Sequence, residues 1–232
     1  MLLLLAILPP LLIAFYVYKQ DKYDKEPKDL LIKSFLFGCF SVIPAIILEL
    51  LAEDLSVFGL FIAVFIGIAL IEEGVKYFFL KKYLYPKKEF NEPMDGIVYA
   101  VMISLGFATV ENIGYVFTSD EGQGLGVAVM RMFTAIPLHA VCGIILGYFV
   151  GLAKFSENSK PLLYKGLFLA ILVHALYDYF IFLGAGMDNE TVILLFSLSM
   201  ATLIIAIYYS KKAIKLHQED SKNRHTTSNN QE

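Results

Sequence analysis

The sequence predicts an all-α, polytopic bundle of transmembrane helices, and three observations support this fold class. The chain of 232 residues is 57% apolar and only 18% charged, and its mean hydropathy is +0.64. Soluble domains carry about 25% charged residues and about 45–50% apolar ones. Seven stretches approach or exceed the roughly 20 apolar residues that a bilayer-spanning helix needs. Most Lys and Arg residues lie between these stretches.

The seven predicted spans follow one another with short connections. In chain order they are Met1–Tyr18, Leu30–Leu51, Val57–Leu80, Gly96–Phe117, Val127–Ala153, Gly166–Leu183 and Thr191–Tyr209. No connection is long enough for a separate domain, so residues 1–215 are predicted to form one integral-membrane domain. The polar residues 216–232 are predicted to be a disordered cytoplasmic tail.

The basic residues alternate between the connections. The first, third and fifth connections and the tail hold all but three of the 19 Lys and Arg residues, and the second, fourth and sixth hold none. The positive-inside rule therefore predicts the N-terminus outside and the C-terminus in the cytoplasm, in agreement with an odd number of spans. The lipid bilayer is thus an expected partner. The net charge of −3 excludes the broad basic surface of a nucleic-acid binder.

Spans one, two and seven carry few polar groups that need explanation. The first and seventh have no ionisable side chain. The second has Lys33 and Glu49 near its ends, where long side chains can reach the interface. Ionisable residues inside spans are costly and commonly functional, so spans three to six are the ones to search for a site.

Span three contains the consecutive acids Glu72 and Glu73, followed by Lys76. Adjacent helical residues point about 100° apart, but Lys76 lies four and three residues after the two acids and can reach both. A structural ion pair needs one acid, and a second would be an uncompensated buried charge. The pair therefore favours chemistry over a purely structural role.

Spans four to six each add ionisable side chains. Span four has Glu111, and span five has Arg131 in its outer turns and His139 near its centre. His139 lies on a stripe with Ala135, Gly143, Gly147 and Gly151, which predicts close packing against a neighbouring helix. Span six has His174, with Asp178 one turn later on the same face, a spacing that lets a carboxylate orient an imidazole.

The depths of these residues predict a polar cavity. Glu72, His139 and His174 fall within roughly 5 Å of the span midpoints. Lys76 lies on the predicted cytoplasmic side, and the remaining ionisable groups of spans four to six lie on the outer side. We expect a cavity near the midplane that opens outward.

Several hydrolytic mechanisms lack their motifs. The sequence has no H-E-x-x-H for a zincin and no G-x-S-x-G with a partner histidine. The run Gly184–Asp188 is one residue too long for the Gly-x-Gly-Asp of aspartyl intramembrane proteases. Carboxylate and histidine chemistry remains, which suits water activation and amide hydrolysis.

A series of short motifs carries a family resemblance. In order they are Glu72-Glu73-x-x-Lys76, Asp95-Gly-Ile-Val-Tyr, Gly106-Phe-Ala-Thr-x-Glu111-Asn112, Pro137-Leu-His139-Ala-x-x-Gly143 and His174-x-x-x-Asp178, with the loop Asp21–Pro27 before them. Together they resemble the PrsW membrane proteases, and more distantly the CAAX prenyl endopeptidases. The resemblance implies a multi-pass protease of the bacterial cell membrane. It implies the first (site-1) cut in a membrane-anchored anti-sigma factor during a stress response.

Seven of the ionisable residues described above are the predicted catalytic residues: Glu72, Glu73, Lys76, Glu111, His139, His174 and Asp178. Either glutamate of span three is expected to activate water, with the two histidines stabilising the oxyanion. The same groups could instead hold a metal such as zinc through His139, His174 and Glu73, and the sequence leaves both mechanisms open. A proton-coupled secondary transporter, also expected to carry midplane acids and histidines, and a non-catalytic scaffold are the alternative functions.

Overall fold

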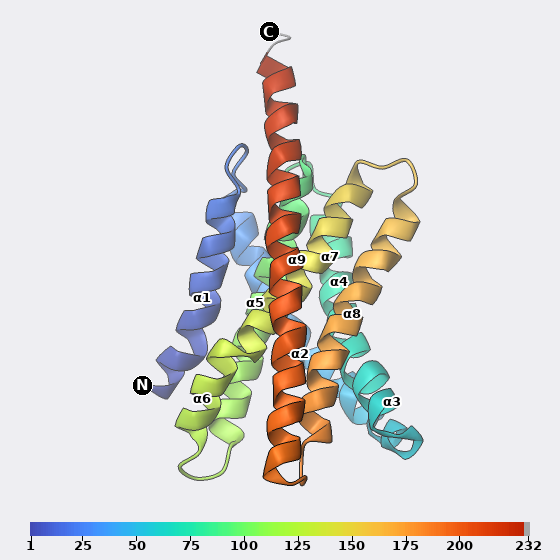
Figure 1. Ribbon diagram of the computed structural model, residues 1–232. Coiled ribbons are helices and arrows are strands. Elements are labelled where there is room, and N and C mark those ends of the chain that lie inside the picture. The colour runs from blue at the N-terminus through green and yellow to red at the C-terminus, as the bar shows by residue number, and fades with distance from the viewer. Residues whose placement is uncertain (230–232) are drawn as a thin grey trace.

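The computed structural model describes residues 1–229, and the side chains of residues 1–226, and every regular element in that part is a helix (Figure 1). The all-α class is therefore confirmed. The longer helices are α1 (Leu2–Gln20), α2 (Lys28–Leu51), α5 (Pro93–Thr118), α6 (Gly124–Phe133), α7 (Ala135–Lys154), α8 (Ser159–Leu183) and α9 (Asn189–Asn229). Between α2 and α5 lie the short segments η1 (Glu53–Phe58), α3 (Leu60–Val64), η2 (Phe65–Leu70), α4 (Ile71–Phe79) and η3 (Leu80–Leu84).

Six helical stretches of the described chain are long and apolar enough to cross a membrane. They are α1, α2, α5, α6 together with α7, α8, and α9 up to Thr226. The predicted third span corresponds instead to the segments from α3 to η3, in which two π-helical stretches, η2 and η3, flank α4. No single regular helix of span length forms there, and the count of seven spans stays a prediction.

The two ends of the bundle match the alternation of the connections. Figure 1 shows the N-terminus near one end and the C-terminus at the other, with the α1–α2 and α7–α8 connections at the C-terminal end. The α1–α2 connection carries Lys22 and Lys25, and Lys154 and Lys160 lie in the helix ends on either side of the α7–α8 connection. The side of the membrane that each end faces stays a prediction.

Helix α5 forms the centre of the bundle. In the most apolar 18-residue stretch of α5, 83% of the residues are buried. In the corresponding stretches of α1 and α9, 22% are buried. Glycines allow α5 to contact α7 closely: a Cβ on Gly147 would lie 2.3 Å from the carbonyl oxygen of Gly96, and one on Gly151 would lie 2.2 Å from that of Pro93. The predicted small-residue stripe on α7 is therefore confirmed as a packing surface.

The predicted fifth span is divided at Thr134, which separates α6 from α7 and has φ −123° and ψ −78°. Pro137 follows three residues later. A proline has no N–H to donate to the carbonyl four residues earlier, and its ring crowds that carbonyl. The break places Arg131 on α6 and His139 on α7.

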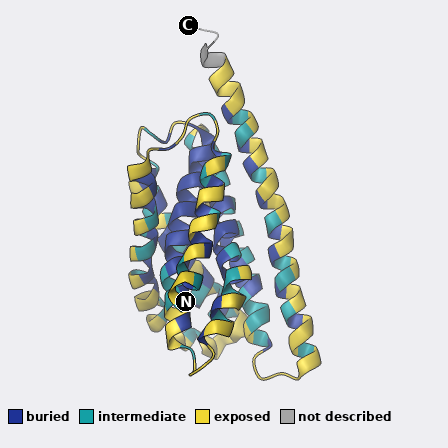
Figure 2. Cartoon of the chain, turned by 90° about the vertical axis from the view of Figure 1, so that its left-hand side faces the viewer, coloured by how far each residue is buried: buried dark blue, intermediate teal, exposed yellow. Residues whose placement is uncertain are grey.

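Helix α9 differs from the sequence-based expectation. Residues 216–232 were predicted to be disordered, but α9 continues as a helix to Asn229, and residues 230–232 lie outside the described part. The extension contacts the bundle: the His217 ring stacks on Tyr148 at a centroid distance of 4.4 Å, and Gln218 donates to the carbonyl of Gln20 at 2.6 Å. These contacts explain why a polar sequence stays helical. Figure 2 shows α9 at the edge of the bundle, with buried residues along one side.

Candidate active site

Helix α4 presents its acids and its lysine to one another in the interior. The Lys76 ammonium lies 3.0 Å from Glu72 Oε2 and 2.8 Å from Glu73 Oε1. All three side chains are buried, at 6%, 0% and 1% exposure for Glu72, Glu73 and Lys76. The predicted bridging of both acids by Lys76 is confirmed. The cation also sits 4.1 Å from the centre of the Phe107 ring on α5.

The two histidines extend this cluster in the same way. His139 Nδ1 lies 3.0 Å from the Lys76 ammonium, and its Nε2 lies 2.8 Å from Glu111 Oε2. His174 Nδ1 lies 2.9 Å from Glu73 Oε1, and its Nε2 lies 3.2 Å from Asp178. Each imidazole therefore points one nitrogen toward the centre and the other toward a peripheral carboxylate.

The structure brings all seven predicted site residues into one connected cluster from α4, α5, α7 and α8. The rings of the two histidines meet edge to face at 5.2 Å. Glu111 and Asp178 are 18% and 19% exposed, whereas Glu73 is fully buried. The cluster thus has a buried centre and a partly accessible periphery.

Two further residues join the cluster that were not among the predicted catalytic residues. Arg131 forms an ion pair with Glu111 at 2.8 Å and donates from Nε to Asn112 Oδ1 at 2.9 Å. Asn112 in turn donates to the carbonyl of Ala6 on α1. The available signal for Arg131 was its position inside a predicted span, because a charge at that depth needs a partner.

The donor set fits a divalent metal ion. One ligand atom from each of Glu72, Glu73, His139 and His174 lies within 4.8 Å of all the others, and all four residues are buried. Glu73 Oε2 is buried without a hydrogen-bond partner. The outer carboxylates of Glu111 and Asp178 stand where the ligand-orienting carboxylates of metal-bound histidines are found. Two imidazoles with carboxylates are typical of zinc sites.

A second group of buried acids lies at the other end of α5. Asp95 accepts from the backbone N–H of Glu92, and Tyr99 donates its hydroxyl to Glu26. Burial raises the pKa of Asp21 to about 6, and that of Glu26 and Glu92 to about 7. These motif residues join the α1–α2 connection to the start of α5, and no contact links them to the histidine cluster among the described residues.

Buried carboxylates and imidazoles inside a bundle of membrane-length helices fit an intramembrane hydrolase, and the family comparison separates this class from the transporters that share such groups. The family description "PrsW family intramembrane metalloprotease" matches residues 26–207. The chain therefore belongs to the PrsW family of intramembrane metalloproteases and is a peptide hydrolase.

Curated relatives agree with this assignment. The chain is 37% identical over 185 residues to Protease PrsW of Clostridioides difficile (strain 630), covering 77% of this chain and 78% of the relative. It is 35% identical over 176 residues to Protease PrsW of Bacillus subtilis (strain 168), covering 75% and 79%. For Protease PrsW of Oceanobacillus iheyensis the identity is 35% over 209 residues, covering 89% and 93%. No solved structure matches the chain at a significant level.

Proposed function

We propose that this protease makes the first cut in a membrane-anchored anti-sigma factor at the bacterial cell membrane, and that the histidine cluster is its active site. The observation that supports the site is the convergence of four buried donor residues on one point, with a peripheral carboxylate behind each histidine. The substrate class comes from the family resemblance. The assignment to a protease family favours peptide hydrolysis over the transporter and scaffold interpretations.

Glu73 is the side chain best placed to accept the proton of an attacking water. Its Oε1 is held by Lys76 and His174, while Oε2 has no partner. A fixed carboxylate with one free acceptor oxygen is positioned for proton transfer before substrate arrives, which is the geometric requirement for a general base. Lys76 holds this carboxylate in place and balances its charge.

The histidines are proposed to stabilise the developing oxyanion, which requires their inner contacts to open when substrate binds, because His139 Nδ1 accepts from the Lys76 ammonium and His174 Nδ1 donates to Glu73. Asp178 fixes the ring of His174, and Glu111 fixes the ring of His139. Donors that are held in place before the reaction avoid the cost of reorienting during it, and each is worth roughly 2.7–4 kcal/mol in acyl transfer. Arg131 neutralises Glu111, so the peripheral carboxylate is not left as an unpaired charge.

Glu72, Glu73, His139 and His174 would hold a metal ion in the same place. A bound divalent metal polarises a peptide carbonyl and acidifies water. The Lys76 ammonium contacts three of these four residues, so lysine and metal use the same donors. The histidine nitrogens that face away from the centre keep their carboxylate partners in either case.

The exposed side of the cluster supports cleavage near the end of the helix bundle that has no basic connections. The more exposed members of the cluster, Glu111, Arg131 and Asp178, are 15–19% exposed. A groove of about 530 Å³ between α5 and α6 is lined by Tyr115, Met130 and Arg131. A substrate segment that enters this groove would meet Arg131 and Glu111 before the buried acids.

Cleavage of a membrane-anchored anti-sigma factor by the purified protein in lipid nanodiscs tests the proposal. Glu73→Gln keeps the size of the side chain and is expected to abolish cleavage, because the amide cannot accept the proton. Glu190→Gln, an exposed acid in the first turn of α9, is the matched control and is expected to cleave normally. Chelator followed by zinc measures whether a metal takes part.

The outcomes separate the substrate from the site. Wild-type cleavage by Glu73→Gln would overturn the role of Glu73. Cleavage of other single-span proteins at the same rate as the anti-sigma factor would leave the site intact and refute the substrate class.

A further inference from the structure

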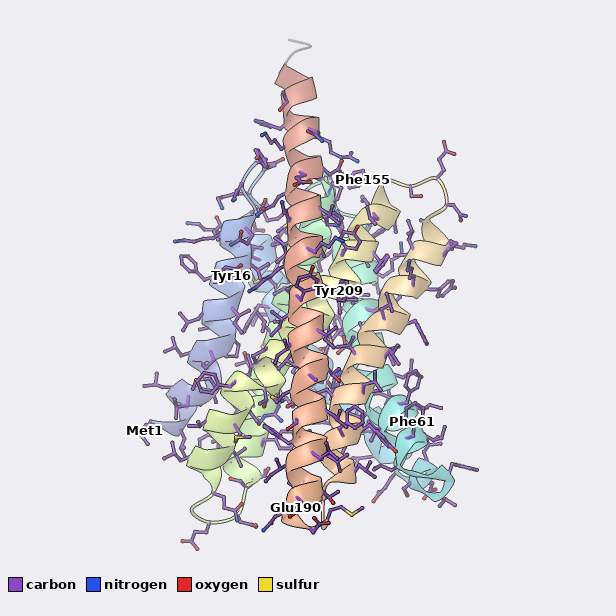
Figure 3. The ribbon with its side chains drawn as sticks, in the orientation of Figure 1. Met1, Tyr16, Phe61, Phe155, Glu190 and Tyr209 are labelled. Atoms are coloured by element: carbon purple, nitrogen blue, oxygen red, sulfur yellow. The ribbon has the colours of Figure 1, made fainter. Side chains whose placement is uncertain are left out.

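An apolar groove runs along the outside of the bundle between α7, α8 and α9, and no part of the cleavage mechanism uses it. Its volume is about 520 Å³. Three aromatic side chains, Tyr148, Phe149 and Tyr209, and two small side chains, Ala206 and Ala213, are among its lining residues. Tyr209 is labelled on α9 in Figure 3. The groove lies on the opposite side of α8 from the buried cluster, since Val173 and Leu176 line it while His174 points inward.

The dimensions of the groove suit a lipid chain. On α9 its lining residues run from Thr202 to Leu216, about 21 Å at 1.5 Å per residue. This is somewhat more than half of a hydrocarbon core about 30 Å thick. A methylene group is close in size to a water molecule, about 30 Å³, so a groove of about 520 Å³ holds about 17 of them.

A protein helix would fill the groove only in part. With side chains a helix is about 10 Å wide, so a 21 Å length occupies roughly 1,600 Å³ and most of it would lie outside a groove of about 520 Å³. An extended acyl chain needs no backbone hydrogen bonds and can follow the narrow space between the helices.

The charges at one end of the groove favour an anionic headgroup. Lys212 lines the groove, and the ammonium of Lys165 lies 5.1 Å from the ring of Phe149, a lining residue. Neither lysine forms an ion pair with an acid in the described part of the chain. Tyr209 adds a hydroxyl three residues before Lys212. Aromatic and basic side chains at this level are the groups that meet lipid headgroups.

We propose that the groove binds one anionic phospholipid, with an acyl chain between α8 and α9 and the phosphate at Lys165 and Lys212. The bound chain would pack against the outer face of α8, whose inner face carries His174. The groove is therefore a lipid site that contacts the active-site helix from behind, and it stands independently of the substrate proposed above.

A single-tryptophan reporter tests this inference, since the chain contains no Trp. Tyr209→Trp places the reporter at the groove, and Phe40→Trp on α2 reports ordinary lipid contact; both native side chains are 59% exposed, so the two reporters are matched in exposure. Each variant is reconstituted in phosphatidylcholine vesicles with a small fraction of phosphatidylglycerol brominated on its acyl chains. Matched vesicles carry brominated phosphatidylcholine instead.

Preferential quenching of the groove reporter is the expected result. Each lysine near an anionic lipid raises the affinity for that lipid about fivefold. The two lysines together therefore predict that the site in Tyr209→Trp prefers phosphatidylglycerol over phosphatidylcholine by about 30-fold. The preference should be absent at Phe40→Trp. Added to the reporter, Lys165→Gln with Lys212→Gln should abolish it, whereas the control pair Lys211→Gln with Lys215→Gln should retain it, because those exposed lysines of α9 do not line the groove.

Equal quenching of the groove reporter by the two brominated lipids would overturn the proposal. Equal loss of the preference for phosphatidylglycerol in the two double lysine variants would also overturn it. Reversal of the quenching by a synthetic transmembrane peptide, but not by unlabelled phosphatidylglycerol, would also overturn it and assign the groove to a protein helix. Protection of the buried Cys142 thiol verifies that each variant is folded.

Discussion

Replacing Lys76 with methionine tests whether lysine and metal share one set of donors. Methionine keeps the length of the side chain but removes the ammonium that contacts Glu72, Glu73 and His139. Without metal, two buried carboxylates lose their shared cation. With metal present, a divalent ion can take the position of the missing charge. The variant should therefore be less stable than the wild type without metal and regain part of that stability when metal is supplied.

The size of the effect follows from the burial of the ion pairs. Lys76 is 1% exposed and its partners are 6% and 0% exposed, and removing one partner of a buried pair costs about 3–5 kcal/mol. For a chain of this length each kcal/mol shifts Tm by about 2–4 °C, so the metal-free variant should melt about 6–20 °C below the metal-free wild type. Zinc at 100 times its Kd would restore about 2.7 kcal/mol.

Thermal unfolding in detergent, followed by a thiol-reactive dye, measures this effect because Cys142 is buried in the folded chain. Lys33→Met is the matched control: its i,i+4 pair with Asp29 is 3.0 Å long but 59% and 65% exposed, and exposed pairs contribute about 0–1 kcal/mol. The reasoning is refuted if Lys76→Met melts within 2 °C of the wild type in chelator. It is also refuted if zinc stabilises the variant no more than the wild type.

Three further expectations concern the periphery of the site, the acids at the far end of α5 and the helix packing. Asp178→Asn should lower zinc affinity and cleavage by about 10–100-fold, because the orienting carboxylate is lost; zinc competition against a chelator measures this, and unchanged affinity would contradict the orienting role. Glu26 has its pKa raised by burial from 4.5 to about 7, so its contribution to stability is fully present below pH 4.5 and is lost as the pH rises to about 7. Thermal unfolding followed by helix content measures this: between pH 5 and pH 8 the Tm should fall less for Glu26→Gln than for the wild type. An equal fall would exclude Glu26 as a source of the pH dependence. Gly147→Ala should destabilise the chain by about 1–3 kcal/mol through overpacking against α5, and a fall in Tm measures this. Gly126→Ala, inside α6 and with nothing within 4 Å of its added Cβ, should not lower Tm, because alanine favours a helix over glycine by about 0.5–1 kcal/mol.

The candidate site could be predicted from the sequence because its residues are exceptions to a simple pattern. A charge inside an apolar stretch is visible without any knowledge of packing, and the i+3 and i+4 spacings of Lys76 fix contacts within one helix. The same holds for His174 and Asp178, whose 3.2 Å contact joins consecutive turns of α8.

Contacts between helices could not be obtained in this way. The pairing of Arg131 with Glu111 joins α6 to α5, and it depends on how these two helices pack. The helical state of residues 216–229 depends on the contacts that His217 and Gln218 make with the bundle. Local polarity predicts disorder there, and tertiary packing overrides it.

The π-helical stretches η2 and η3 on either side of α4 have a consequence for how this segment can change over evolution. A π-helical turn accommodates an extra residue within a helix, and one residue corresponds to about 100° of rotation. Deleting a single residue in η2 would convert the π-helical turn into an α-helical one, so the rotation that a deletion imposes on a regular helix would be absorbed locally. The segment can therefore lose a residue in η2 during evolution while α3 and the two acids of α4 keep their orientation and the donor cluster is preserved.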